Sequence, residues 1–313
     1  MTGVVRSYAL YGTRLATSVE FPELLAVPEA PARWTFERAE RLAPMVDARE
    51  LGSDPLYGDV SARLYVHAGG HRIVVDDTGS FELGADGRRI TWEPGGNAWP
   101  DFVRAHLMGR VLATSLYLDG LLPLHASAVE TRDGVIAFLA PKGFGKSTLA
   151  LALVTAGARL GTDDTLPIDP RDPPLAWPGI HNVRVHEDSI TAVGTAASDL
   201  ETREGKQVVT GLVPESLQSR PAPLAAIYLL DPAAANAEGV TRTPMPPTIA
   251  ALAVVAHVKI GRMLGSTAAA PMLERTAAIT GRVPVFHLHA PRDLERLGDT
   301  AAAILTWHGK PPR

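Results

Sequence analysis

One segment restricts the fold of this chain more than any other, the glycine-rich stretch Ala-Pro-Lys-Gly-Phe-Gly-Lys-Ser-Thr at residues 140–148. The apolar run 135–139 precedes it, and the helical pattern of residues 149–154 follows it. A strand, a glycine loop ending in Gly-Lys-Ser and a helix form the layout of a phosphate-binding P-loop. The sequence therefore predicts an α/β sheet with an anion site at a helix N-terminus.

The residue types in this loop suit phosphate groups. Gly143 and Gly145 let the backbone turn its N–H groups toward phosphate oxygens. Lys146 is expected to reach the terminal phosphates of ATP, and the Ser147 hydroxyl to hold Mg²⁺. The first glycine of the usual pattern is replaced by Ala140, and a glycine-rich turn without a ligand is the alternative. The predicted nucleotide-binding residues are Lys142, Gly143, Phe144, Gly145, Lys146, Ser147 and Thr148.

Composition narrows the classes of function. The 313 residues include no cysteine, which excludes disulfides, thiolate zinc sites and a cysteine nucleophile. A formal net charge of −4 gives no electrostatic reason to expect nucleic acid or an anionic membrane as a partner. The N-terminus lacks the pattern of a signal peptide, and the apolar stretches are too short to span a bilayer. We therefore expect a cytoplasmic protein.

The sequence predicts two domains. Residues 1–120 indicate a β-rich module, with hairpin signals at Gly69-Gly70 and Asp86-Gly87 and a connecting helix from Asp101 to about residue 119. Residues 121–313 indicate the P-loop domain. Its expected strands are 124–129, 135–139, 158–162, 224–230 and 283–288, and its expected helices cover about 247–263, 270–281 and a segment ending near 306. The polar stretch 192–207 is expected to form a mobile loop.

A second cluster of chemistry-bearing residues is Asp163-Asp164, directly after the predicted strand 158–162. Ligands of parallel sheets bind beyond the carboxyl ends of the strands, so this pair and the P-loop face one crevice if their strands are neighbours. One carboxylate can hold Mg²⁺ while the other deprotonates an attacking hydroxyl. The alternative is that the two aspartates only cap the next turn.

A resemblance to a known family rests on these motifs together with His125 in Leu-His-Ala-Ser-Ala-Val. Over residues 122–166 the chain resembles the catalytic core of HPr kinase/phosphorylase, which shares its fold with phosphoenolpyruvate carboxykinases. The family's second signature would fall on residues 174–182, where Pro174 replaces its Glu and Ala176 its Arg. This departure weakens the expectation of HPr as substrate and of phosphorolysis.

The resemblance implies an ATP- and Mg²⁺-dependent kinase that phosphorylates a hydroxyl. His125 would assist proton transfer with the acidic pair. We assign Asp163 as the base and Asp164, with Ser147, as the Mg²⁺ ligand, while Lys146 neutralises the β- and γ-phosphates. Arg184 and Lys206 are further candidates to approach the transferred group, with solvated surface charge as the alternative for each.

The layout of the whole chain is similar to HPr-kinase-related proteins of bacterial biosynthetic clusters. The similarity lies in the opening Tyr8–Gly12 and in an ending like Val283-Pro-Val and Pro291-Arg-Asp-Leu294. It implies a peptide or protein substrate, namely a serine of a lasso-type precursor in RiPP biosynthesis, which the N-terminal module would bind. HPr kinases are hexameric, and a homo-oligomer is left open here.

Other functions stay open from the sequence. One is a kinase of a free amino acid or another small alcohol. A second is a nucleotide-binding regulatory protein without catalysis, although pure binding would need neither His125 nor the acidic pair. A transport or motor ATPase would need a longer apolar Walker-B strand and an arginine finger, and the sequence identifies neither.

Overall fold

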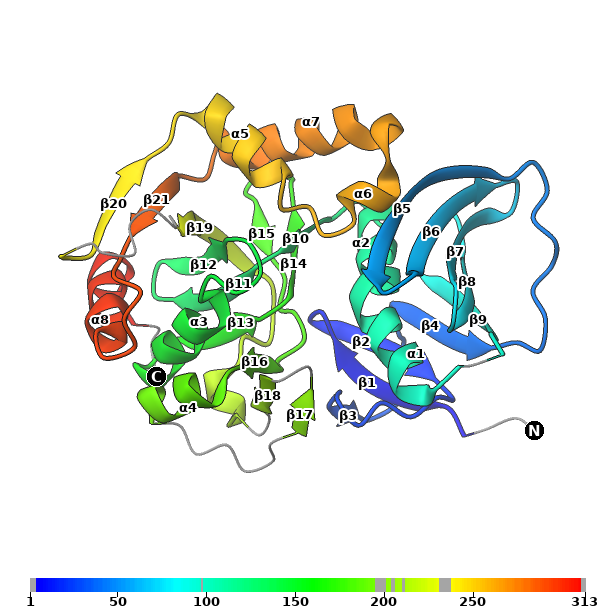
Figure 1. Ribbon diagram of the computed structural model, residues 1–313, viewed down its shortest axis with the longest axis horizontal. Helices are drawn as coiled ribbons and strands as arrows, with labels where there is room; N and C mark the ends of the chain where they lie inside the picture. Colours follow the sequence, from blue (N-terminus) through cyan, green and yellow to red (C-terminus); the bar gives the residue numbers. More distant parts are fainter. Residues whose placement is uncertain are drawn as a thin grey trace. The chain divides into compact units, whose positions relative to one another are not determined.

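The structure is a computed structural model that describes residues 4–96, 98–194, 201–203, 206–209, 212–230 and 238–310. The chain forms two compact units. Figure 1 labels their helices and strands. The first unit comprises residues 1–123 and 258–274, and the second comprises 124–257 and 275–313. The sequence analysis assigned residues 258–274 to the P-loop domain, whereas in the structure they belong to the first unit.

The reason for this difference is close backbone packing within the first unit. Helix α6 (Gly261–Leu264) lies against strand β5 (Arg49–Tyr57). A Cβ atom on Gly52 would lie 2.4 Å from the carbonyl oxygen of Arg262, so only glycine permits this approach. A contact between segments so far apart in the chain leaves no periodic signal in the sequence.

The first unit is built on a nine-stranded, mainly antiparallel sheet. Its strands are β1 (Arg6–Leu10), β2 (Thr13–Thr17), β3 (Ala26–Val27), β4 (Trp34–Arg38), β5, β6 (Val60–His67), β7 (Gly70–Val75), β8 (Gly79–Leu83) and β9 (Arg89–Pro94). They follow the order β3-β1-β2-β4-β9-β8-β7-β6-β5. The β6–β7 and β8–β9 hairpins confirm the two turn signals of the sequence.

The connecting helix is also confirmed. It consists of α1 (Pro100–His106), a π-helical turn (Leu107–Val111) and α2 (Leu112–Leu118). The Ser115 hydroxyl donates to the Gly87 carbonyl at 2.6 Å, which joins α2 to the β8–β9 turn. Gly87 has a φ of 70°, and a Cβ there would lie 2.7 Å from the Ser115 carbonyl oxygen. The hairpin glycine thus serves the helix contact as well as the turn.

The second unit holds a mixed sheet. Its strands are β10 (Leu122–His125), β11 (Ser127–Thr131), β12 (Gly134–Leu139), β13 (Arg159–Thr162), β14 (Thr165–Asp169), β15 (Leu175–Ala176), β19 (Ala222–Leu230), β20 (Thr241–Pro244) and β21 (Val285–His289). The main path is β10-β14-β15-β19-β12-β11-β13, with β21 beside β19 and β20. Strand β12 runs parallel to β19, and β19 runs parallel to β21.

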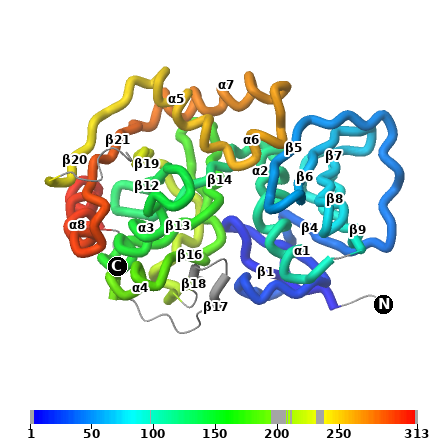
Figure 2. Tube along the Cα trace, in the orientation of Figure 1, coloured from blue at the N-terminus to red at the C-terminus, as the bar shows by residue number. Residues whose placement is uncertain are grey.

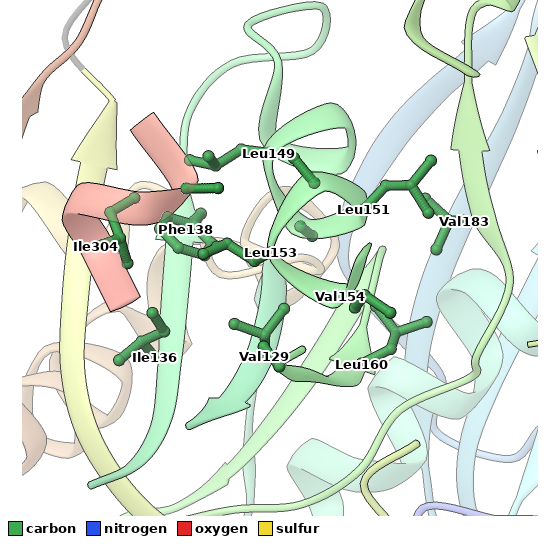
Figure 3. Close-up of a cluster of buried hydrophobic side chains, with 14 of the residues drawn as sticks. Val129, Ile136, Phe138, Leu149, Leu151, Leu153, Val154, Leu160, Val183 and Ile304 are labelled. Carbon is green, nitrogen blue, oxygen red and sulfur yellow. The ribbon is translucent and has the colours of Figure 1, made fainter. Parts of the chain in front are cut away.

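Helix α3 (Lys146–Thr155) fills the centre of this unit. It contacts β11, β13 and the C-terminal helix α8 (Leu297–His308), which lies beside it in the trace of Figure 2. Leu149, Leu151 and Leu153 point into a buried cluster with Phe138 and Ile304, drawn in Figure 3. This packing fixes the helix that follows the glycine loop, and therefore fixes the loop's position at the sheet edge.

Two local expectations are corrected. The polar stretch 192–207, expected as a loop, contains β17 (Glu201–Arg203) and part of β18 (Lys206–Val209), which form a small sheet with β16 (Val183–Val185). Residues 195–200 and 204–205 lie outside the described part of the chain. The helix expected over 247–263 is divided into α5 (Pro247–Val255) and α6. Two further helices of the described residues are α4 (Glu187–Val193) and α7 (Ala269–Thr280). Within the described residues, no helix has both the length and the apolar character needed to cross a membrane.

Candidate functional site

The candidate site lies at one edge of the second sheet, where β12 and β13 end and β11 begins. Strand β11 pairs antiparallel with both β12 and β13, so the last two strands run parallel without being neighbours. The two strands are thus not neighbours, which was the condition set in the sequence analysis for a shared crevice. Their carboxyl ends nevertheless lie at the same edge of the sheet, because β11 runs antiparallel between them. The intervening antiparallel strand brings its first residue, Ser127, to that edge as well.

The glycine loop leaves β12 and enters α3 through two left-handed residues. Gly143 has a φ of 87° and Gly145 a φ of 84°, values that glycine adopts without steric cost. Lys146 follows at the first turn of α3 and is only 6% exposed. Its Nζ atom donates to the carbonyl oxygens of Ala140 at 2.8 Å and Pro141 at 3.2 Å. The ammonium group is thus held inside the loop.

Asp163 is buried among hydrogen-bond donors and is 6% exposed. Its Oδ1 atom accepts from the Ser127 hydroxyl at 2.7 Å, and its Oδ2 atom accepts from the backbone N–H of Arg184 at 2.8 Å. The Ser147 hydroxyl also donates to it. Burial raises the pKa of Asp163 to about 6, against the opposing effect of these donors.

Asp164 occupies a different environment from its neighbour. Its side chain is 54% exposed, and its Oδ1 atom lies 3.2 Å from Nδ1 of His125, itself 39% exposed. The same ring nitrogen lies 3.2 Å from the Asp164 carbonyl oxygen. The carboxylate and the imidazole thus form a pair that is open to solvent.

The remaining predicted residues divide into those at the loop and those elsewhere. The Thr148 hydroxyl donates to the Ser189 hydroxyl at 3.2 Å, while Lys142 is exposed on the loop. Arg184 meets the site through its backbone N–H, and its side chain is exposed. Lys206 lies in β18 opposite Arg203 of β17, on the small sheet. Among the described contacts, none brings the Arg184 side chain to the loop.

Sequence reasoning missed two residues of this site. Ser127 stands two positions after His125, a spacing that keeps side chains on one face of extended chain and that signals its place. His257 follows α5, and its carbonyl oxygen accepts from the His125 N–H at 2.8 Å. Burial first, and then the charges of Lys146 and His125, lower the pKa of His257. The apolar helical pattern around His257 concealed it.

The oxygen donors at the edge fit a magnesium ion. The described residues contain no cluster of three or more His, Cys, Asp or Glu side chains arranged to hold a metal. Magnesium bound beside a nucleotide needs only one or two protein carboxylates, because phosphates and water supply the other ligands. Ser147 and Asp163 are already in hydrogen-bond contact and provide such a donor pair.

Comparison with known proteins gives a distant likeness among solved structures. No protein-family model and no curated protein matches this chain. Among solved structures, the chain is similar to the Hpr(Ser) kinase/phosphatase from Coxiella burnetii at 13% sequence identity and a TM-score of 0.31. The alignment covers 59% of this chain and 96% of that one.

Proposed function

We propose that this protein is a phosphotransferase that moves the γ-phosphoryl group of ATP to a hydroxyl. The supporting observation is the meeting of a glycine loop, the buried Lys146 and the buried Asp163 at one sheet edge, with the Ser147 hydroxyl bonded to Asp163. Buried ammonium and carboxylate groups cost folding free energy, and such groups concentrate at functional sites.

The chain's own residues divide the work. The loop N–H groups and Lys146 bind and neutralise the phosphates, and the Lys146 ammonium exchanges its loop carbonyl partners for phosphate oxygens. Ser147 and Asp163 hold Mg²⁺, which supplies further charge neutralisation when bound. This assignment reverses the roles expected from the sequence for Asp163 and Asp164.

Accessibility supports the reversal. Both oxygens of Asp163 already accept hydrogen bonds, whereas Asp164 is half exposed and paired with His125. A general base must come within hydrogen-bond reach of the proton that it removes. Asp164 therefore takes the acceptor's hydroxyl proton, the acceptor oxygen forms a bond to the γ-phosphorus, and the bond to the bridging oxygen breaks to release ADP. His125 positions Asp164.

The decisive experiment compares two lysines of the second unit. Lys146→Ala should reduce transfer from γ-labelled ATP by at least about 10²-fold, the scale for removing one preorganised charge donor. Lys310→Ala is the matched control, because Lys310 is exposed and lies outside the glycine loop, and it should retain most of the activity. Full activity in Lys146→Ala, with the fold verified by circular dichroism, would refute the P-loop function.

The acceptor is proposed from the sequence resemblance alone. A peptide serine, in the first place that of a lasso-type precursor, is the leading candidate, and a free amino acid or small alcohol is the second. Incubation with Mg²⁺, labelled ATP, HPr, free serine, free threonine and a serine-ending peptide separates them. Label on the peptide alone supports the peptide kinase, whereas tight ATP binding without label on any acceptor supports a regulatory nucleotide-binding protein.

A further inference from the structure

The outer side of the glycine loop carries a contact that the proposed function does not use. Arg292 donates through Nη2 to the Gly143 carbonyl oxygen at 3.1 Å. The same guanidinium group lies over the Phe144 ring, with Cζ 4.9 Å from the ring centroid. One arginine therefore makes a hydrogen bond and a cation–π contact with two successive loop residues.

The two loop glycines face open space on the side where a side chain would stand. A Cβ atom added to Gly143 or Gly145 would meet nothing within 4 Å among the described residues. Both glycines have positive φ values, a conformation that the flexible glycine backbone does not hold by itself. From the inside, Lys146 binds the carbonyl oxygens at the loop's start. Arg292 binds its middle from the outside.

Arg292 lies in a short segment between two packed elements. It lies between β21, which is paired with β19 in the sheet, and α8, whose Ile304 is fully buried in the core around α3. The guanidinium thus links the loop after β12 to a segment held at both of its ends. A contact anchored in this way can hold the loop in one conformation.

Peptide geometry gives this contact a consequence for phosphate. In a planar trans peptide the C=O of one residue and the N–H of the next point in opposite directions. Holding the Gly143 carbonyl toward Arg292 therefore directs the Phe144 N–H away from Arg292, to the opposite side of the loop. Phosphate-binding loops work by aiming such N–H groups at the anion.

We propose that Arg292 is a positioning residue that holds the loop in its phosphate-binding conformation, with Phe144 as its second contact. This inference rests on the proposed nucleotide binding. The preorganised loop binds the phosphate chain that nucleoside diphosphates and triphosphates share. Arg292 therefore increases the affinity for ADP and ATP by the same factor and leaves the rate of transfer at saturating ATP unchanged.

The test measures the dissociation constants of ADP and ATP and the steady-state kinetics. Arg292→Ala should weaken the binding of both nucleotides about ten-fold, as expected for one hydrogen bond from a charged donor, with kcat within about two-fold of the unaltered value. Arg292→Lys should recover part of this loss. Arg296→Ala is the matched control, because Arg296 lies on the same segment but donates to the Glu238 carbonyl oxygen. It should bind both nucleotides normally.

A second variant keeps the proposal testable if Arg292→Ala does not fold. Phe144→Leu should weaken ADP and ATP binding less than Arg292→Ala does. The double variant should be weaker by less than the product of the two single effects, because the two residues act as one contact. Additive effects would overturn the proposed contact.

Two other outcomes would also overturn it. Unchanged affinities in Arg292→Ala show that the loop needs no such support. Loss of ATP affinity without loss of ADP affinity, or a lower kcat at saturating ATP, shows instead that Arg292 touches the transferred phosphoryl group. If the unaltered protein binds no nucleotide, the proposed function fails and the role of Arg292 fails with it.

Discussion

Each unit of this protein contains a nine-stranded sheet, but the side chains buried against the two sheets differ. The first encloses aromatic side chains, with Trp34, Phe36 and Phe81 fully buried and the rings of Phe36 and Phe81 stacked. The second has a mainly aliphatic core around α3, which also includes the stacked rings of Phe138 and Tyr228. It buries Lys146 and Asp163 at the edge where β12 and β13 end. The two units therefore differ in how their buried charged groups are partnered.

In the first unit, charged groups near the interior are paired with one another. Arg72 is buried, and its Nε atom donates to Glu82 at 2.6 Å while Nη2 donates to the Ala43 carbonyl oxygen. In the second unit, Asp163 accepts its described hydrogen bonds from hydroxyl groups and a backbone N–H instead. Burial disfavours the charged form of this carboxylate and raises its pKa, so the ionised group costs stability at that edge. We expect perturbations there to affect chemistry and perturbations in the first unit to affect stability.

The largest expected effect is a loss of activity that distinguishes Asp164 from Asp163. Asp164→Asn should lower kcat by about 10²–10⁴-fold, the range for loss of a general base, with ATP affinity retained. Asp163→Asn is the matched comparison and should raise the Mg²⁺ concentration needed for half-maximal activity. Activity measured over a Mg²⁺ titration distinguishes the two variants. The opposite pattern would restore the roles expected from the sequence.

The second prediction concerns the aromatic core of the first unit. Phe81→Ala removes a fully buried ring and should lower the free energy of unfolding by about 3–5 kcal/mol through lost burial and a cavity. ATP affinity, measured at a temperature where the variant is folded, should stay unchanged. Urea denaturation and nucleotide titration check the two parts, and a loss of ATP affinity in the folded variant would break the contrast between the units.

The smallest effect is a pH dependence of the second unit. Burial lowers the pKa of His181 from 6.5 to about 4, against a hydrogen bond with the Gln218 backbone. Between these values the unfolded chain binds a proton that the folded protein does not, so stability falls as pH falls from about 6.5 to 4. His181→Asn should remove up to about 3 kcal/mol of this acid sensitivity. Unfolding free energies measured across this pH range test the prediction.

Asp163 provides a control of opposite sign for that experiment. Its pKa is raised from 3.8 to about 6, so the folded protein binds the extra proton and stability falls as pH rises through this window. Without Mg²⁺, Asp163→Asn should make the protein more acid-sensitive than the unaltered chain, whereas His181→Asn should make it less so. Shifts of the same sign in both variants would contradict the burial of one of the two groups.

Local signals determined much of this protein from its sequence. The glycine loop with its flanking strand and helix, the two hairpin turns and the helix from Asp101 all follow from short-range periodicity and turn chemistry. Such features depend on residues within a few positions of one another. The resemblance to HPr kinases implied that His125 would interact with the acidic pair, and in the structure Nδ1 of His125 lies 3.2 Å from Oδ1 of Asp164.

Long-range packing decided the rest. The insertion of β11 between β12 and β13, which brings Ser127 to Asp163, depends on strand pairing that no local pattern encodes. The contacts of Arg292 with the loop join residues 149 positions apart. Residue type and local spacing thus determined which groups this chain has for chemistry. Only the tertiary structure decided which groups are buried, which are exposed and which meet, because burial and long-range contact are properties of the folded chain as a whole.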